Sequence, residues 1–165
     1  DEQLTREFNQ IKQYKALWST APFPPTFVTV DAVVVKSGHV LLVKRKFEPG
    51  KGLLALPGGF LRNKERIEDG MLRELREETG LRVSKPILRS CIKESKVFDY
   101  PERSLRGRTI THAYYIRLDD AGQLPEVKGS DDAARAFWLP LMDVAKREDE
   151  FFEDHSQIVH AFMNR

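Results

Sequence analysis

The sequence predicts an α/β fold of the α+β sandwich type, in which a mixed β-sheet is packed between helices. Two observations lead to this prediction. Runs of β-branched and apolar residues, typical of strands, are interspersed with segments whose apolar residues recur at helical spacing. The chain is also long enough, at 165 residues with 41% hydrophobic side chains, to bury one core.

The first residues predict a helix followed by a stiff connector. Apolar side chains recur at helical spacing over residues 4–18, and prolines at 22, 24 and 25 then favour an extended chain. We therefore divide the chain into an N-terminal helix with a Pro-rich connector, residues 1–23, and one folded domain, residues 24–165. The pattern leaves open whether the helix packs on the core of the domain.

The predicted strands begin with a hairpin. Residues 26–36 and 39–46 are β-branched and apolar, and Ser37-Gly38 between them predicts a two-residue turn. Similar runs predict further strands over residues 87–97, 109–118 and 134–139.

Three more segments predict helices that would cover the sheet. The segment over residues 66–79 has the period of a helix, and Gly80 follows it at the position where a left-handed cap is favoured. The other two predicted helices close the chain, over residues 140–146 and 151–163.

Composition and charge exclude several classes of protein. With 27 basic and 25 acidic side chains the net charge is +2, which argues against nucleic-acid binding by bulk positive charge. No apolar run approaches the ~18 residues that span a bilayer, and the first residues lack the pattern of a signal peptide. Cys91 is the single cysteine, so no internal disulfide forms. We expect a cytoplasmic domain that binds neither nucleic acid nor membrane.

One segment, residues 59–81 (GFLRNKERIEDGMLRELREETGL), combines glycine, acidic and basic residues at fixed spacing. Five residues separate Gly59 from Glu65, seven more precede Arg73, and Glu74-Leu75-x-Glu77-Glu78-x-Gly80-Leu81 follows. A charge-rich helix is usually only a solvated face. Nine such constraints would, however, meet by chance on the order of once in a billion windows. The segment therefore indicates a functional site.

The chemistry of this segment follows from the geometry of a helix. Glu74, Glu77 and Glu78 fall within about a third of the helical circumference, beside the apolar stripe that must face the core. Carboxylates this close repel each other, and a divalent cation removes the repulsion. Oxygen ligands suit Mg²⁺ or Mn²⁺, and Mg²⁺ also contacts phosphate oxygens and water. The segment predicts metal-dependent attack of water on a phosphoanhydride.

The segment resembles the Nudix box, G-x5-E-x7-R-E-U-x-E-E-x-G-U with U aliphatic, and matches it at every defined position. The resemblance implies the Nudix fold and Mg²⁺-dependent hydrolysis, with Mn²⁺ as the alternative cation. It implies that Glu74, Glu77 and Glu78 bind metal and act in catalysis, with Glu74 a candidate for polarising the water. It further implies that Arg73 orients the glutamates and that the backbone carbonyl of Gly58 completes the coordination.

Two more positions have accessory roles in this scheme. The resemblance implies that Glu65 supports the loop before the helix and the outer shell of the metal. Glycine at 58 and 59 also fits independently, because it lets the backbone approach a ligand closely. Asn63-Lys64 departs from the Gly-rich turn of many relatives, which alters the loop and leaves the ligands in place.

A second group of residues predicts the site that binds the substrate. Arg103, Arg106 and Arg108 lie within six positions, and arginine grips phosphate oxygens with two donors. Phe98, just upstream, is a candidate for stacking on an adenine ring, and Arg45 lies in a basic triplet at the end of the second strand. The alternative is a solvent-facing turn beside core aromatics.

The loop over residues 122–132 offers further carboxylates. Glu126, Asp131 and Asp132 are candidate accessory bases or metal ligands, because some enzymes of the resembling family supply one from such a loop. The alternative, at least as well supported by composition, is a polar loop whose aspartates cap or turn the chain.

The stretches PPTFVTVDAVVV, VLLVKRK, ALPGGF, VFDYPERSLRGRTITHAYY and GSDDAARAFWLPL narrow the resemblance. They are similar to the Nudix domains of bifunctional bacterial NMN adenylyltransferase/ADP-ribose pyrophosphatases. This implies hydrolysis of ADP-ribose to AMP and ribose 5-phosphate. Two alternatives stay open. One is a regulatory domain that senses ADP-ribose, and the other is a hydrolase of an NTP, a dinucleoside polyphosphate or a nucleotide sugar.

The resemblance also bears on partners. It implies a small nucleotide diphosphate as the substrate, and a nucleotidyltransferase domain that precedes this one in a longer protein, with residues 1–23 as the connector. Many ADP-ribose hydrolases of the superfamily form dimers, so a homodimer that uses the N-terminal helix is one arrangement the sequence leaves open.

Overall fold

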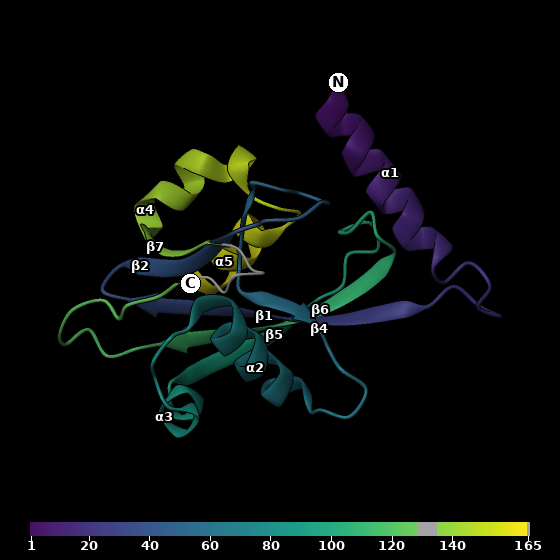
Figure 1. Ribbon diagram of the computed structural model, residues 1–165. Coiled ribbons are helices and arrows are strands. Elements are labelled where there is room, and N and C mark those ends of the chain that lie inside the picture. Colours follow the sequence, from purple (N-terminus) through teal and green to yellow (C-terminus); the bar gives the residue numbers. More distant parts are fainter. Residues whose placement is uncertain (129–134, 165) are drawn as a thin grey trace.

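The computed structural model describes residues 1–128 and 135–164, and it confirms the predicted mixed sheet between helices (Figure 1). The strand order across the sheet is β3-β2-β1-β6-β5, with β4 paired to β1 and β7 paired to β2. The parallel pair is β1 with β6, and the other pairs are antiparallel. The strands are β1 (Thr26–Lys36), β2 (His39–Lys44), β3 (Leu54–Ala55), β4 (Gly58–Phe60), β5 (Ile92–Phe98), β6 (Arg108–Arg117) and β7 (Arg135–Pro140).

Helices cover both faces of this sheet. On one face lie α2 (Ile67–Thr79) and α3 (Lys85–Ser90), and on the other lie α4 (Leu141–Val144), the 3-10 helix η1 (Ala145–Glu150) and α5 (His155–Met163) (Figure 1). The central strand β1 is therefore buried on both sides, which explains its continuous apolar run. Its even-numbered Val30, Ala32 and Val34 pack with α2, whereas Val33 and Val35 pack with α5.

Two turns form where the sequence predicts them. Ser37 and Gly38 both have positive φ, 48° and 72°, as a tight hairpin between β1 and β2 requires. Helix α2 ends at Gly80, whose φ of 61° is left-handed and whose amide donates to the Arg76 carbonyl. The first turn fixes the hairpin register, and the second ends the helix that holds the box.

The structure corrects two of the predicted elements. The strand predicted over residues 87–97 begins only at Ile92, because Pro86 lies in the first turn of α3, where a proline without an amide is tolerated. The helix predicted over residues 151–163 begins only at His155. Phe151 and Phe152 are buried, and Phe151 forms a parallel bridge with Leu54 that holds this segment outside the helix.

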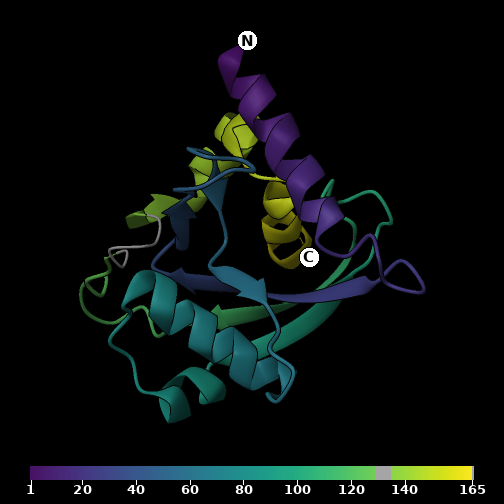
Figure 2. The same ribbon diagram turned by 45° about the vertical axis from the view of Figure 1, so that its right-hand side comes forward.

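Helix α1 (Glu2–Ala16) has no buried residue, and its first turns project away from the sheet (Figures 1 and 2). Leu4 and Phe8 are exposed. Its other end contacts the domain, because Tyr14 packs against Phe27 and Phe60. In the part of the chain that the structure describes, no helix is both long and apolar enough to cross a membrane.

Candidate active site

A cavity of about 420 Å³ lies between the box helix α2, the ends of β1 and β2, and the segment that enters α5. Its volume is typical of small-molecule sites. The predicted residues that line it are Arg45, Gly58, Gly59, Glu74, Glu78, Arg103 and Arg106. Two carboxylates of α2, which we call the acidic wall, thus share one cavity with a group of guanidinium side chains, which we call the cationic wall.

The acidic wall consists of Glu74 and Glu78, one helical turn apart on α2. Glu78 accepts a hydrogen bond of 3.4 Å from the amide of Gly58 on β4. Glu74 lies so close to Gly59 that a Cβ there would come within 2.6 Å of its Oε1. Glycine at 59 is therefore required by the approach of β4 to Glu74, whereas glycine at 58 is required by the approach of β4 to β1, because a Cβ there would lie 2.1 Å from the Val30 carbonyl oxygen.

The two carboxylates are only partly compensated: Glu74 pairs with Arg73 at 2.9 Å, and the charge of Arg45 acts weakly on Glu78. Burial, with a smaller contribution from the negative charge of Glu74, raises the pKa of Glu78 to about 8. Burial likewise raises the pKa of Glu74, while its hydrogen bond from Arg73 acts in the opposite direction. A pair of desolvated carboxylates that resist ionisation is the arrangement that a divalent cation relieves.

Arg73 holds the rest of the box together. Its guanidinium donates to both oxygens of Glu65, at 2.9 and 2.6 Å, and to Glu74 Oε1 at 2.9 Å. The hydrogen bonds from Arg73 lower the pKa of Glu65 to about 2, and the backbone amide of Arg62 adds to this effect. Glu65 is thus fixed as a carboxylate that orients Arg73, which in turn orients Glu74.

Glu77 lies apart from the acidic wall. Its side chain is half exposed, is not among the lining residues of the cavity, and pairs with Arg73 at 3.2 Å and Arg62 at 3.7 Å. In residues 1–128 and 135–164, no three His, Cys, Asp or Glu side chains gather as a ready metal cluster. The oxygen donors that fit a divalent cation are those of Glu74 and Glu78 beside the backbone of Gly58.

The cationic wall is built around aromatic rings. The guanidinium of Arg45 stacks 3.9 Å from the ring centre of Phe152, and its Nε donates to the carbonyl of Pro49. The guanidinium of Arg106 lies 5.0 Å from the ring centre of Phe60 and 5.5 Å from that of Phe152. Burial lowers the pKa of Arg45, and the nearby charge of Arg106 lowers it further. One carboxylate, that of Glu153, shares this wall with the two guanidinium groups, so the wall keeps an excess of positive charge that an anion would balance.

The other predicted substrate residues occupy different surroundings. Arg103 is buried and donates two hydrogen bonds to Asp154, at 2.9 and 2.7 Å, so its guanidinium is already paired. Arg108 donates to the carbonyl of Asp99, and neither it nor Phe98 lines the cavity. Phe98 packs instead edge-on against Phe162 in the core.

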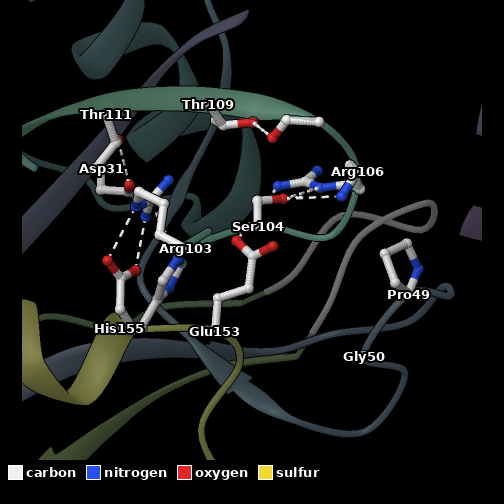
Figure 3. Close-up of polar contacts among 12 residues, drawn as sticks. Asp31, Pro49, Gly50, Arg103, Ser104, Arg106, Thr109, Thr111, Glu153 and His155 are labelled. Atoms are coloured by element: carbon white, nitrogen blue, oxygen red, sulfur yellow. Dashed lines mark hydrogen bonds and ion pairs between the residues drawn. The ribbon is translucent and has the colours of Figure 1, made fainter. Parts of the chain in front are cut away.

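A buried polar network lies beneath the cavity, where Asp31, Arg103 and His155 come together (Figure 3). Thr111 donates to Asp31 at 2.5 Å, and burial raises the pKa of Asp31 to about 7. Burial and neighbouring arginines lower the pKa of His155 well below its usual value. Its neutral ring accepts the amide of Leu56 at Nδ1, at 2.9 Å, so Nε2 carries the proton and faces Asp31 at 3.9 Å.

Sequence reasoning missed several lining residues. Asp31 gave a signal, since it is the one acid in the apolar strand TFVTVDAVVVK. Phe152, Glu153 and His155 gave none, because only the tertiary fold brings the start of α5 to the cavity. Glu153 has a left-handed φ of 46° and pairs with Arg106 at 3.5 Å (Figure 3).

The predicted accessory carboxylates of the later loop are not part of this arrangement in the described chain. Glu126 is exposed and does not line the cavity. Asp131 and Asp132 lie outside the described residues.

Comparisons with known proteins identify the family of this chain. The family model for the NUDIX domain matches residues 25–162. The chain is 37% identical over 136 residues to an ADP-ribose pyrophosphatase of Methanocaldococcus jannaschii, covering 82% of this chain and 72% of that protein.

Two solved structures are also similar. One is a bifunctional NMN adenylyltransferase/ADP ribose pyrophosphatase from Francisella tularensis, complexed with AMP and a Mn ion, with 44% identity and a TM-score of 0.95. The match covers 98% of this chain and 48% of that one, so this chain spans about half the length of the Francisella protein. The other is the NUDIX domain of Shewanella oneidensis NrtR complexed with ADP ribose, with 27% identity, a TM-score of 0.70, and coverage of 93% and 97%. The intact box and the family match over most of the chain lead to one conclusion: this chain belongs to the Nudix family.

Proposed function

We propose that the chain hydrolyses ADP-ribose to AMP and ribose 5-phosphate with Mg²⁺ as its cofactor. One observation carries the proposal. A single cavity joins a carboxylate pair that requires a cation, Glu74 and Glu78, to a guanidinium pair that requires an anion, Arg45 and Arg106. A metal-bound diphosphate would supply both, because its cation would bind the carboxylates and its phosphate oxygens would bind the guanidinium groups. The pyrophosphatase of M. jannaschii and the ADP-ribose complex of the Shewanella domain support the choice of substrate.

In this proposal the acidic side chains bind the cation and the arginines bind the substrate. Glu74 and Glu78, with the carbonyl of Gly58, would hold the cation, and Glu74 is the candidate that accepts a proton from water. Glu77, which lies outside the cavity and pairs with Arg73, would join them only by turning away from that partner. A bound divalent cation supplies charge neutralisation at the phosphate oxygens and a water of lowered pKa. The Francisella complex with a Mn ion supports Mn²⁺ as an alternative.

The guanidinium groups of Arg45 and Arg106 would bind the diphosphate oxygens and orient the substrate. Water adds across one P–O bond of the diphosphate, so that one phosphate leaves with the adenosine and the other with the ribose. Arg103, already paired with Asp154, supports the wall rather than gripping the substrate.

Substrate profiling tests the proposal. The purified chain with Mg²⁺ is given ADP-ribose, an NTP, a dinucleoside polyphosphate and a nucleotide sugar, and products are separated by chromatography. We expect ADP-ribose to have the highest kcat/KM. Preferred cleavage of another nucleotide would overturn the substrate, and tight ADP-ribose binding without turnover would favour a regulatory domain.

We also propose a longer protein in which a nucleotidyltransferase domain precedes this one. The Francisella protein, which has both activities in its name and about twice the length of this chain, supports this arrangement. Sequencing the gene upstream of residue 1 tests it.

A homodimer is a second proposed assembly. Sedimentation of the purified chain, which measures its mass in solution, tests it.

A further inference from the structure

Helix α1 lies outside residues 25–162, the part of the chain that matches the family model, yet it contacts two neighbours of the cationic wall, Gly50 beside Arg45 and Phe60 beside Arg106. Figure 2 shows α1 passing beside the loop that follows β2, with its last turn next to β1 and β4. A connector that only linked two domains would not require specific contacts with the cavity. The contacts of α1 are of two kinds, one polar and one aromatic.

The polar contact reaches the loop of residues 45–53. The Glu7 carboxylate accepts a hydrogen bond of 2.9 Å from the amide of Gly50, and Arg6 pairs with Glu48 at 3.6 Å. Gly50 is itself wedged against the cationic wall, because a Cβ there would lie 2.4 Å from the Phe152 ring and 3.3 Å from Arg45 Nε. Glu7 therefore fixes a backbone position that touches both partners of the Arg45–Phe152 stack.

The aromatic contact reaches Arg106. The ring of Tyr14 stacks on that of Phe60 with 6.0 Å between ring centres, and the guanidinium of Arg106 lies 5.0 Å from the centre of the same Phe60 ring. Burial raises the pKa of Tyr14 while the charge of Arg106 lowers it, so the hydroxyl lies within electrostatic range of that guanidinium. Trp18, just after α1, packs against Gly107, the residue that follows Arg106.

We propose that α1 is a positioning element of the hydrolase site, in which Glu7 and Tyr14 hold Gly50 and Phe60 and thereby place Arg45 and Arg106 against the substrate. The inference rests on the proposed function of the two arginines. Glu7 and Tyr14 touch no reacting atom, so they are positioning residues. Because Glu7 and Tyr14 contact the neighbours of the two arginines, Gly50 and Phe60, we expect them to act on substrate binding and to leave the chemical step intact.

The test compares kinetic constants for ADP-ribose in matched variants. Glu7→Ala removes the acceptor of the Gly50 amide, and Tyr14→Ala removes the ring beside Phe60. We expect KM to rise about fivefold in each, the effect of one lost hydrogen bond or ring contact, with kcat within about twofold of the parent. Glu7→Gln keeps an acceptor oxygen and Tyr14→Phe keeps the ring, so both should restore KM. Glu2→Ala, an exposed acid on the same helix, is the control and should match the parent.

Calorimetric binding of ADP-ribose in Ca²⁺ supplies a readout that does not depend on turnover. Weaker binding in Glu7→Ala and Tyr14→Ala, with the parent affinity in Glu2→Ala, supports the inference even for a parent chain that does not hydrolyse ADP-ribose. A parent chain that binds ADP-ribose but does not hydrolyse it would count against the proposed function and not against the positioning role of α1. Unchanged affinity and KM in both alanine variants, or a fall in kcat with KM unchanged, would overturn the inference.

Discussion

Glu78 is the residue at which burial and charge conflict most strongly. Its carboxylate lies in the cavity next to that of Glu74, and burial raises its pKa to about 8. At neutral pH and without a cation the side chain is therefore mostly protonated, and a glutamine of the same shape resembles that form. In the proposed function, Glu78 needs its negative charge only to bind the cation.

We therefore expect Glu78→Gln to lower kcat about a hundredfold or more, because one charged metal ligand is lost. The melting temperature of the metal-free protein should stay the same or rise, since no charge is left in the cavity. Glu68→Gln, on the exposed side of α2, is the matched control and should keep the parent activity. Near-parent activity in Glu78→Gln would contradict a role in binding the metal.

The raised pKa of Glu78 predicts that metal binding depends on pH. A cation needs the ionised form, so binding below pH 8 releases a proton, and the affinity for Mg²⁺ should rise up to about tenfold per pH unit between pH 6 and 8. The folded pKa lies above the ordinary value of 4.5, so the folded state holds this proton more tightly, and this group lowers the stability of the metal-free protein as pH rises from 4.5 towards 8. Mg²⁺ titrations at pH 6, 7, 8 and 9 measure the slope. A flat profile in the parent protein would be inconsistent with this assignment.

A substitution of Arg106 tests whether the cationic wall binds the substrate. Its planar guanidinium lies between the rings of Phe60 and Phe152, a position that the ammonium of lysine does not reproduce. We expect Arg106→Lys to raise KM for ADP-ribose about tenfold, through loss of the stack and of two-donor binding. Arg117→Lys, at the exposed far end of β6, should leave KM unchanged. Equal KM values for the two variants would remove Arg106 from the substrate site.

At the scale of elements, the site depends on how α2, β4 and the start of α5 are joined to the sheet. Helix α2 approaches β4 over two glycines, and α5 is joined to the loop before β6 by the Arg103–Asp154 pair. The Arg103 side chain is 2% exposed and that of Asp154 is 24% exposed, so the pair is largely buried, where loss of one partner is costly.

Arg103→Ala should lower the free energy of unfolding by about 3 kcal/mol, because it leaves Asp154 without its buried partner. Chemical denaturation measures the change. Arg117→Ala removes an exposed pair with Asp120 at 3.6 Å and should cost less than about 1 kcal/mol. Similar losses in the two variants would mean that burial of the Arg103 pair does not matter.

The elements also show what sequence can predict. The hairpin at Ser37-Gly38 and the cap at Gly80 follow from local backbone requirements, so their positions were predictable. Pro86 was ambiguous, because a proline fits both the start of a helix and a break before a strand. Phe151 is held outside α5 by its pairing with Leu54, a partner that the local sequence does not show.

At the scale of the molecule, the two walls of the cavity differ in how far they could be predicted. The carboxylates lie on one helix, and their spacing brings Glu74 and Glu78 together in the cavity, whereas Glu77, predicted with them, lies outside it. The cationic wall joins Arg45, Arg106 and Phe152 from three distant segments, and from sequence Phe98 and Arg108 were equally good candidates for it. Tertiary packing decides which partner an arginine of the cavity has. Arg103 lines the cavity but is already paired with Asp154.

The central claim is that the two walls together cleave the diphosphate of ADP-ribose, and product analysis tests it most directly. The purified chain is incubated with ADP-ribose, with Mg²⁺ and with a chelator, and AMP and ribose 5-phosphate are quantified over time. The account predicts equal amounts of the two products, formed only with the cation and lost in Glu78→Gln. No AMP in the presence of Mg²⁺, or the same yield in the chelator, would contradict it.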